Sequence, residues 1–145
     1  MRVISADEIE AALSYPALVD VLENAFRLGA IAPPRHHHAM PLADGGPEAT
    51  LLLMPAWTAS APGAATAGKY LGIKSVTVFP GNGKRGMPAV LGAYLLMSAE
   101  TGAPLALMDA PRLTAWRTAG ASALAARYLA RADASRLAVV GAGAQ

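Results

Sequence analysis

Near its start, the chain alternates polar and hydrophobic positions at helical spacing. Ser5 followed by Glu8 forms a capping box, which predicts a short helix that ends near Leu13. Apolar residues then lie three or four positions apart, so a second, amphipathic helix is expected from Ser14 to near Gly29.

The middle of the chain predicts a sheet. Runs rich in β-branched, aromatic and other apolar residues predict about five strands, at residues 35–42, 49–56, 69–79, 90–98 and 104–109. Glycine- and proline-containing turns separate several of them, and the connection at 100–104 is typical of a hairpin. The sheet is therefore expected to be mostly antiparallel. Residues 80–86 are interpreted as a long, flexible turn.

The last third of the chain changes character again. Pro111 opens a long helix to about Leu129, whose many alanines indicate close packing against another element. After a linker, an apolar strand at residues 137–140 runs into Gly141-Ala-Gly143. A glycine turn after a strand is how a dinucleotide-binding fold begins, although such a turn by itself is more often only a turn. The fold class expected is α+β, leading into the first strand of a truncated Rossmann domain.

Composition narrows the classes of protein. The chain has 145 residues, of which 54% are hydrophobic and 15% charged, which excludes intrinsic disorder and predicts surface that another domain or chain covers. The net charge of +2 is too small for a nucleic-acid-binding protein. The absence of cysteine excludes disulfides and fits the cytoplasm, which we take as the expected location. The charge-free stretch 49–68 is broken by prolines, so no membrane helix is expected.

Three cations interrupt apolar segments. Arg35 follows two prolines, Lys74 lies within a core-like strand, and Arg117 lies in the alanine-rich helix. Taken singly, each is more often a solvent-facing residue. A buried cation, however, needs a carboxylate or an anionic ligand. Arginine suits bidentate binding of a carboxylate, and a lysine in an apolar pocket loses its proton readily.

The three histidines are consecutive. In a strand His36 and His38 share one face, and His37 points to the other. The sequence offers no obvious further ligands beside them, so we predict no metal site.

Several motifs, in order along the chain, resemble the ornithine cyclodeaminase/mu-crystallin family. They are Pro34-Arg35, Leu53-Met-Pro-Ala56, Lys74-Ser-Val-Thr-Val-Phe-Pro-Gly-Asn82, Gly86-Met-Pro-Ala-Val90, Glu100-Thr-Gly-Ala-Pro-Leu-Ala-Leu107, Thr114-Ala-Trp-Arg-Thr-Ala-Gly-Ala-Ser122 and Val140-Gly-Ala-Gly-Ala-Gln145. The resemblance covers essentially the whole chain.

The resemblance implies two domains and a nicotinamide cofactor. Residues 1–133 match the substrate-binding and dimerisation domain of a homodimer, and residues 134–145 match the start of the Rossmann domain for NAD or NADP. Arg35 and Arg117 match the residues that hold the substrate carboxylate, and Lys74 matches the catalytic lysine that contacts the substrate. The positions that match cofactor-binding residues are Thr118, Gly141, Gly143 and Gln145. A catalytic aspartate is expected in the rest of the Rossmann half.

The reaction implied is hydride transfer between nicotinamide and the nitrogen-bearing carbon of a small α-imino or α-amino acid, such as Δ1-pyrroline-2-carboxylate or proline. Residues 77–82 are more similar to the ketimine reductases and amino-acid dehydrogenases of the family, because ornithine cyclodeaminases tend to carry Gly-His-Pro where Val78-Phe79-Pro80 stands. Two alternatives stay open: an ornithine cyclodeaminase, and a non-catalytic dimerisation or small-molecule-binding module. Without a complete cofactor site, the chain by itself is expected to be inactive.

Overall fold

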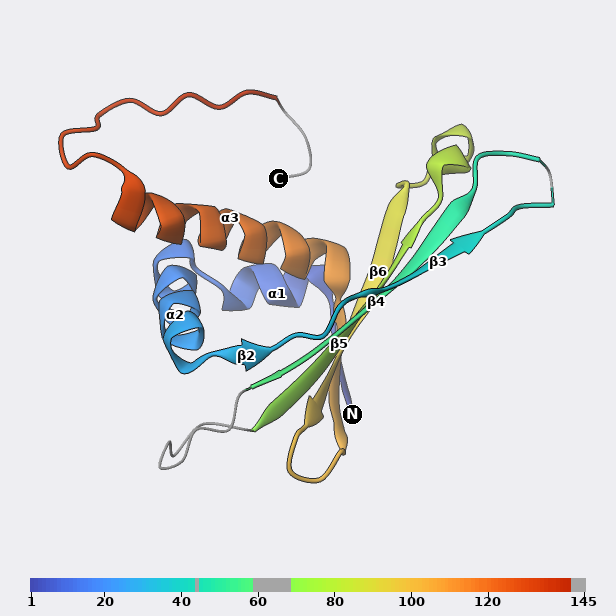
Figure 1. Cartoon of the computed structure of the whole chain (residues 1–145), viewed down its shortest axis with the longest axis horizontal. Coiled ribbons are helices and arrows are strands. Elements are labelled where there is room, and N and C mark those ends of the chain that lie inside the picture. Colours follow the sequence, from blue (N-terminus) through green and yellow to red (C-terminus); the bar gives the residue numbers. More distant parts are fainter. Residues whose placement is uncertain (44, 59–68, 142–145) are drawn as a thin grey trace.

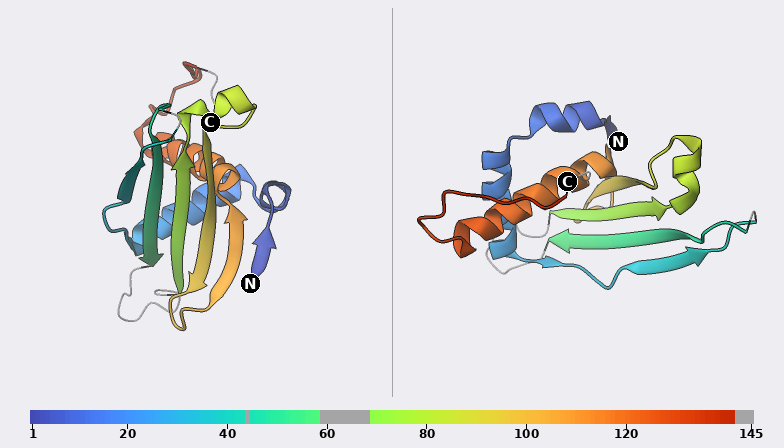
Figure 2. Two further views of the ribbon diagram at one scale, coloured as in Figure 1. Left: turned by 90° about the vertical axis from the view of Figure 1, so that its right-hand side faces the viewer. Right: turned by 90° about the horizontal axis from the view of Figure 1, so that it is seen from above.

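In the computed structural model, the α-helices lie on one face of a twisted sheet (Figures 1 and 2). The structure describes residues 1–43, 45–58 and 69–141. The helices are α1 (Ala6–Ala12), α2 (Tyr15–Leu28) and α3 (Ala110–Leu129). The α+β architecture with a mostly antiparallel sheet and a long C-terminal helix is confirmed. Of the helices in the described part of the chain, none is long and apolar enough to cross a membrane.

Within the described residues, the sheet has seven strands, ordered β1-β7-β6-β5-β4-β2, with β3 also pairing β4. The five predicted strands are present as β3 (His36–Met40), β4 (Ala49–Thr58), β5 (Tyr70–Val78), β6 (Val90–Ser98) and β7 (Pro104–Asp109). The prediction did not include β1 (Arg2–Ile4) and β2 (Ala30–Ile31), which are too short to show a periodic pattern. The β1–β7 pair is parallel, and the other pairs are antiparallel.

Strand register decides which side chains face the helices. Lys74 of β5 lies opposite Met54 of β4 and Tyr94 of β6. We call the end of the sheet at Val78, where β5 ends, the projecting end. The next row toward it consists of Leu52, Val76 and Gly92. Because side chains alternate between the two faces of a strand, these rows share the face of Lys74, which reaches a residue of α3.

Both predicted N-terminal helices form, and of the two only α1 has a side-chain cap. Ser5 and Glu8 make both hydrogen bonds of the capping box at the start of α1. Ser14 precedes α2 without a side-chain cap, and Pro16 occupies its first turn. The helix ends at Gly29, whose φ of 80° lies in the region that favours glycine.

Two contacts of different kinds join α2 to α3. Gly120 lies so close to α2 that a Cβ there would come 3.0 Å from Leu22 Cδ1. At the far ends of the helices, Glu23 accepts hydrogen bonds from the Tyr128 hydroxyl and the guanidinium groups of Arg27 and Arg127. Helices α2 and α3 therefore pack closely at Gly120, whereas Ala123 and Ala126, two of the alanines on which the prediction rested, are exposed.

Two local predictions differ from the structure. Residues 80–86 were expected to form a long, flexible turn, but Pro80–Arg85 form a 3-10 helix, η1. In this helix the buried side chain of Asn82 donates a hydrogen bond to the Pro88 carbonyl. The predicted strand at 137–140 is not formed, and Leu137 and Val139 are 89% and 76% exposed. A strand needs a hydrogen-bonding neighbour, and this segment has none among the described residues.

Candidate functional site

A hollow of about 450 Å³ lies between the helix-facing side of the sheet and the first turns of α3. Strands β4, β5 and β6 form its floor, and Ala110, Pro111 and Thr114 of α3 form one wall. All three cations singled out in the sequence, Arg35, Lys74 and Arg117, line it. The fold therefore brings together residues that lie far apart along the chain.

Lys74 rises from the middle of the floor. Its Nζ lies 3.4 Å from Thr114 Oγ1, to which it donates a hydrogen bond. Burial lowers the pKa of Lys74, and the nearby positive charges of Arg117 and Arg35 lower it further. The ammonium group therefore gives up its proton more easily than an exposed lysine does.

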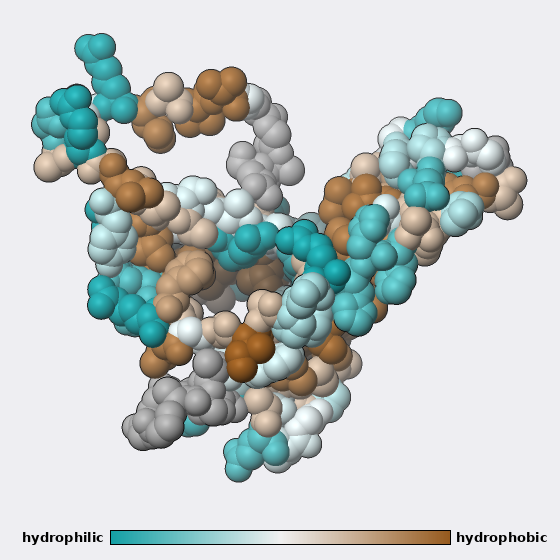
Figure 3. Space-filling model, in the orientation of Figure 1, coloured by the Kyte–Doolittle hydropathy of each residue, from teal (hydrophilic) through white to brown (hydrophobic). Residues whose placement is uncertain are grey.

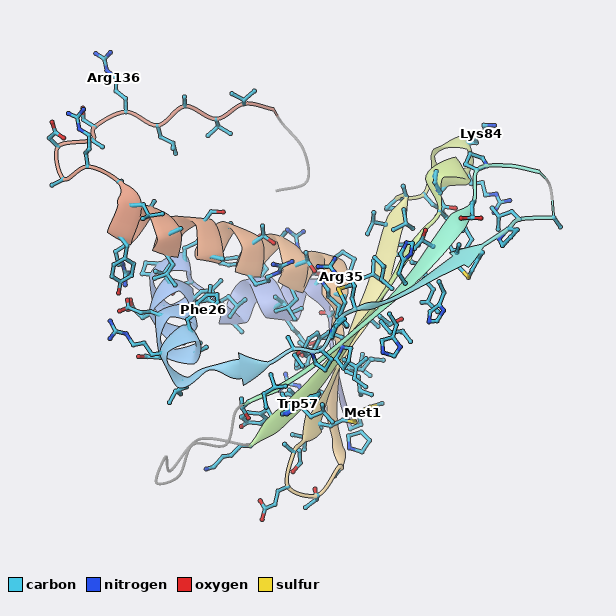
Figure 4. The ribbon with its side chains drawn as sticks, in the orientation of Figure 1. Met1, Phe26, Arg35, Trp57, Lys84 and Arg136 are labelled. Carbon is cyan, nitrogen blue, oxygen red and sulfur yellow. The ribbon has the colours of Figure 1, made fainter. Side chains whose placement is uncertain are left out.

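The two arginines approach from different elements. Arg117 comes from the second turn of α3, and Arg35 comes from the segment between β2 and β3 (Figure 4). Among the described residues, the ion pairs include neither arginine nor Lys74, and no carboxylate lines the hollow. The hollow therefore carries an excess of positive charge, which suits an anion able to accept several hydrogen bonds.

The floor changes character along the strands. Beyond Lys74, toward the projecting end of the sheet, it is built from Leu52, Val76, Val78 and Val90. In Figure 3, hydrophobic residues gather on the flank of the projecting end, beside a hydrophilic group near the start of α3. The hollow thus has a cationic end and an apolar end.

The predicted cofactor residues are placed only in part. Thr118 lies one position beyond Arg117, and its buried hydroxyl oxygen has no hydrogen-bond partner within the described structure. Such a group is unfavourable unless a ligand or water satisfies it. Gly141 has a φ of 99°, a conformation that favours glycine. Gly143 and Gln145 lie outside the described residues.

The histidines form no metal centre in the structure. The rings of His36 and His38 meet edge to face at 6.3 Å, and register places them on the sheet face opposite Lys74. Within the described ranges, no group of three metal-ligating side chains occurs.

Two neighbours of Lys74 were not identified from the sequence. Thr114 is the hydrogen-bond partner of Lys74. Its position three residues before Arg117 places the two side chains on the same helix face, and this spacing could have indicated Thr114 from the sequence. Tyr94 lies directly opposite Lys74, and burial raises the pKa of its hydroxyl. Only the β5–β6 register reveals Tyr94.

Comparisons with known proteins show which sequences and structures the chain is similar to. The family model described as the ornithine cyclodeaminase/mu-crystallin family matches residues 1–145. An alanine dehydrogenase of Archaeoglobus fulgidus is 35% identical over 99% of this chain and 41% of its own length. The chain spans about two fifths of the length of the curated relatives it matches.

Two solved structures share the fold. The Δ1-pyrroline-2-carboxylate reductase of Thermococcus litoralis, in complex with NADH and L-proline, is 31% identical with a TM-score of 0.69, over 92% of this chain and 39% of that protein. An archaeal alanine dehydrogenase dimer with bound NAD is 34% identical with a TM-score of 0.73, over 93% of this chain and 39% of that protein.

Proposed function

This chain belongs to the ornithine cyclodeaminase/mu-crystallin family, and from that membership we propose that the protein carrying it is a nicotinamide-dependent oxidoreductase. The reaction is hydride transfer to or from the nitrogen-bearing carbon of a small α-imino or α-amino acid, with Δ1-pyrroline-2-carboxylate and proline as the representative pair. The observation that carries this proposal is the meeting of Arg35, Lys74 and Arg117 in one hollow without a carboxylate among its described lining residues.

The two arginines hold the substrate. A guanidinium group presents paired N–H donors that match the two oxygens of a carboxylate. Arg35 and Arg117 reach the hollow from different elements, so together they fix the carboxylate and the orientation of the adjacent carbon. Fixing that carbon toward the hydride donor is catalysis by positioning.

Lys74 moves the proton. Reduction of an imine adds a hydride to carbon and a proton to nitrogen, and the reverse reaction removes both. The lowered pKa of Lys74 lets its Nζ donate this proton in one direction and accept it in the other. The hydrogen bond to Thr114 Oγ1 holds Nζ at the wall of the hollow while it does so.

The cofactor proposed is NAD or NADP, and it supplies the hydride when bound. Thr118, whose buried hydroxyl is without a partner in the described structure, fits a hydrogen bond to it. Gly141, with its positive φ, fits the first glycine of a phosphate-binding turn, and Gly143 and Gln145 complete that proposed turn. The proposed division is a substrate-binding domain at residues 1–133 and the start of a Rossmann domain at 134–145.

The same proposal includes a homodimer. The helices lie on one face of the sheet (Figure 2). Strand register places alternate apolar residues, such as Leu53, Ile73 and Leu95, on the opposite face. An extended apolar face is characteristic of an interface. The similarity to an alanine dehydrogenase described as a dimer supports this assignment.

The test compares two arginines of α3 in the full-length polypeptide. Arg117→Ala removes a guanidinium group that binds the substrate carboxylate. We therefore expect kcat/KM for reduction of Δ1-pyrroline-2-carboxylate by NADH or NADPH to fall ~100-fold, equivalent to about 3 kcal/mol. Arg112→Ala removes an exposed arginine whose partner is Glu10, and should leave kcat/KM within about twofold. Equal kinetics in the two variants would contradict the assignment of Arg117 to substrate binding.

The same assays distinguish the alternative functions. Conversion of added ornithine to proline and ammonia would favour a cyclodeaminase, and no turnover of either substrate would favour a binding module.

A further inference from the structure

The sheet face opposite the helices is largely apolar from one edge to the other. Ile31 of β2 and Val3 of β1 lie on this face at its two edges, and they are 48% and 68% exposed. Strand register places one apolar residue from each strand between them on the same face: Leu53, Ile73, Leu95 and Leu107. We call the face that carries these residues the open face, and it is the face proposed above for the homodimer.

Two histidines interrupt the apolar character of the open face at its β3 edge. His36 and His38 pair with Leu53 and Leu51 of β4, which places both imidazoles on the open face, and both residues are exposed. Their rings meet edge to face with centroids 6.3 Å apart. The face therefore carries two neighbouring groups that change charge near neutral pH.

The histidine pair has no carboxylate partner within the described part of the protomer. The next positions on the open face beyond β4 are Ser75 and Thr77 of β5, which are uncharged. Arg35 precedes the pair along the chain and reaches the hollow on the other face. Of the acidic residues of this sheet, Glu48 precedes β4, and Asp109 caps α3 from β7, three strands beyond β4.

The symmetry of a homodimer defines what the pair would meet. In a symmetric dimer the same patch of each copy faces the other copy. The surface brought to the pair is then a second open face, with the same uncharged positions on β4 and β5 and two further histidines. A protonated imidazole there would lose water without gaining an anion and would face other positive charges.

We propose that His36 and His38 make self-association through the open face depend on pH, so that the dimer is stable while the imidazoles are neutral and separates as they take up protons. This inference rests on the proposed homodimer and is independent of the proposed reaction.

The direction and size of the effect follow from proton linkage. The separated protomers bind more protons than the dimer does, so the dimer has its full stability above about pH 7.5 and weakens as the pH falls through the range in which imidazole is protonated. Where one imidazole per protomer has to stay neutral in the dimer, the dissociation constant rises ~100-fold between pH 8 and pH 5.5.

The dissociation constant of the full-length polypeptide tests the proposal. It is measured at pH 8 and pH 5.5 by dilution of fluorescently labelled copies, and we expect at least a ~100-fold increase at pH 5.5. Circular dichroism should be the same at both pH values, because the pKa of Glu23 is lowered to about 2 and the ionic contacts between α2 and α3 persist at pH 5.5. A dimer that is equally stable or tighter at pH 5.5 overturns the inference and leaves the homodimer intact. A monomer at pH 8 contradicts the homodimer itself, and the inference fails with it.

Matched variants assign the effect to the pair. In the double variant His36→Gln and His38→Gln, the two dissociation constants should agree within about threefold, because neither side chain titrates. His37→Gln removes the neighbouring imidazole on the other face and should keep the parent's pH dependence. Full pH dependence in the double variant overturns the inference.

A fixed charge supplies a second test that needs no change of pH. His38→Lys places a permanent cation on the open face, and the dimer should already separate at pH 8. His37→Lys places the same charge on the other face and should leave the dimer intact. A His38→Lys dimer as stable as the parent at pH 8 overturns the inference.

Discussion

Replacing Gly72 by alanine tests how Lys74 is held in the sheet. Gly72 precedes Lys74 by two positions on the same face of β5, and the Tyr94 ring lies across it. A Cβ at Gly72 would lie 2.5 Å from Tyr94 Cζ and closer still to its hydroxyl oxygen. Ordinary contact begins near 3.4 Å, so the hydroxyl end of the ring must move by more than ~1 Å or the strands must separate.

The expected destabilisation follows from this overlap. Overpacking of this kind costs typically about 1–3 kcal/mol, and we expect Gly72→Ala to lower the free energy of unfolding by about 2 kcal/mol. Because Tyr94 is the cross-strand neighbour of Lys74, displacement of the ring should also raise KM for the imine. The assay is urea denaturation of the full-length polypeptide, with initial rates measured on the same samples.

A second substitution and a control test whether the Tyr94 ring causes the destabilisation by Gly72→Ala. Tyr94→Leu removes Cζ, the Cε atoms and the hydroxyl, which are the atoms that a new Cβ would meet. In the Tyr94→Leu background, Gly72→Ala should therefore cost less than about 0.5 kcal/mol, giving a coupling energy above 1 kcal/mol. Gly81→Ala, at a glycine with open space around its Cβ position, should be close to neutral. Equal destabilisation by Gly72→Ala in both backgrounds would refute the packing explanation.

Three further predictions concern titration and an unpaired hydroxyl. Arg117→Gln removes one of the charges that lower the pKa of Lys74, so the pH profile of kcat should move to higher pH, whereas Arg112→Gln should not move it. Hydrogen bonds from Tyr128 and Arg27 lower the pKa of Glu23 to about 2 from 4.5, so its stabilising effect is complete above pH 4.5 and lost as the pH falls toward 2; thermal melts should show Glu23→Gln losing less stability than the parent over that range. Thr118→Val should leave the melting temperature of the cofactor-free protein unchanged or raised and weaken NAD or NADP binding several-fold, whereas Thr118→Ser, which keeps the hydroxyl, should bind as the parent does.

The elements with strong periodicity were predictable from the sequence. Both N-terminal helices, the long helix α3 and the five main strands lie close to the predicted ranges. The capping box at Ser5 works locally, because its hydrogen bonds join residues within one turn. Strand β1 was not predictable in this way, because Arg2 pairs with Ala106, a partner that no local pattern identifies.

The sequence identifies the three cations of the site, but it does not predict that they meet in space. Lys74 and Arg117 each interrupt an apolar segment, and Arg35 follows two prolines; these exceptions to the pattern singled them out. Their convergence depends on β3 joining the edge of β4 and on α3 crossing back over the sheet, which are tertiary facts. Thr114 could have been suspected from its helical spacing from Arg117, whereas only the strand register identifies Tyr94 as a neighbour of Lys74.

The uncompensated charge of the hollow leads to a last prediction. Lys74 lies where an apolar residue would pack better against the floor, and its ammonium group is partly desolvated beside two other cations. Lys74→Met should therefore raise the melting temperature of the ligand-free protein. A bound carboxylate offsets the repulsion, and a ligand at 100 times its dissociation constant stabilises the native state by about 2.7 kcal/mol. The same saturating concentration of L-proline should raise the melting temperature of the parent and raise that of Lys74→Met much less. A lower melting temperature for ligand-free Lys74→Met would mean that the lysine stabilises the fold, and its position would then need no anionic ligand to explain it.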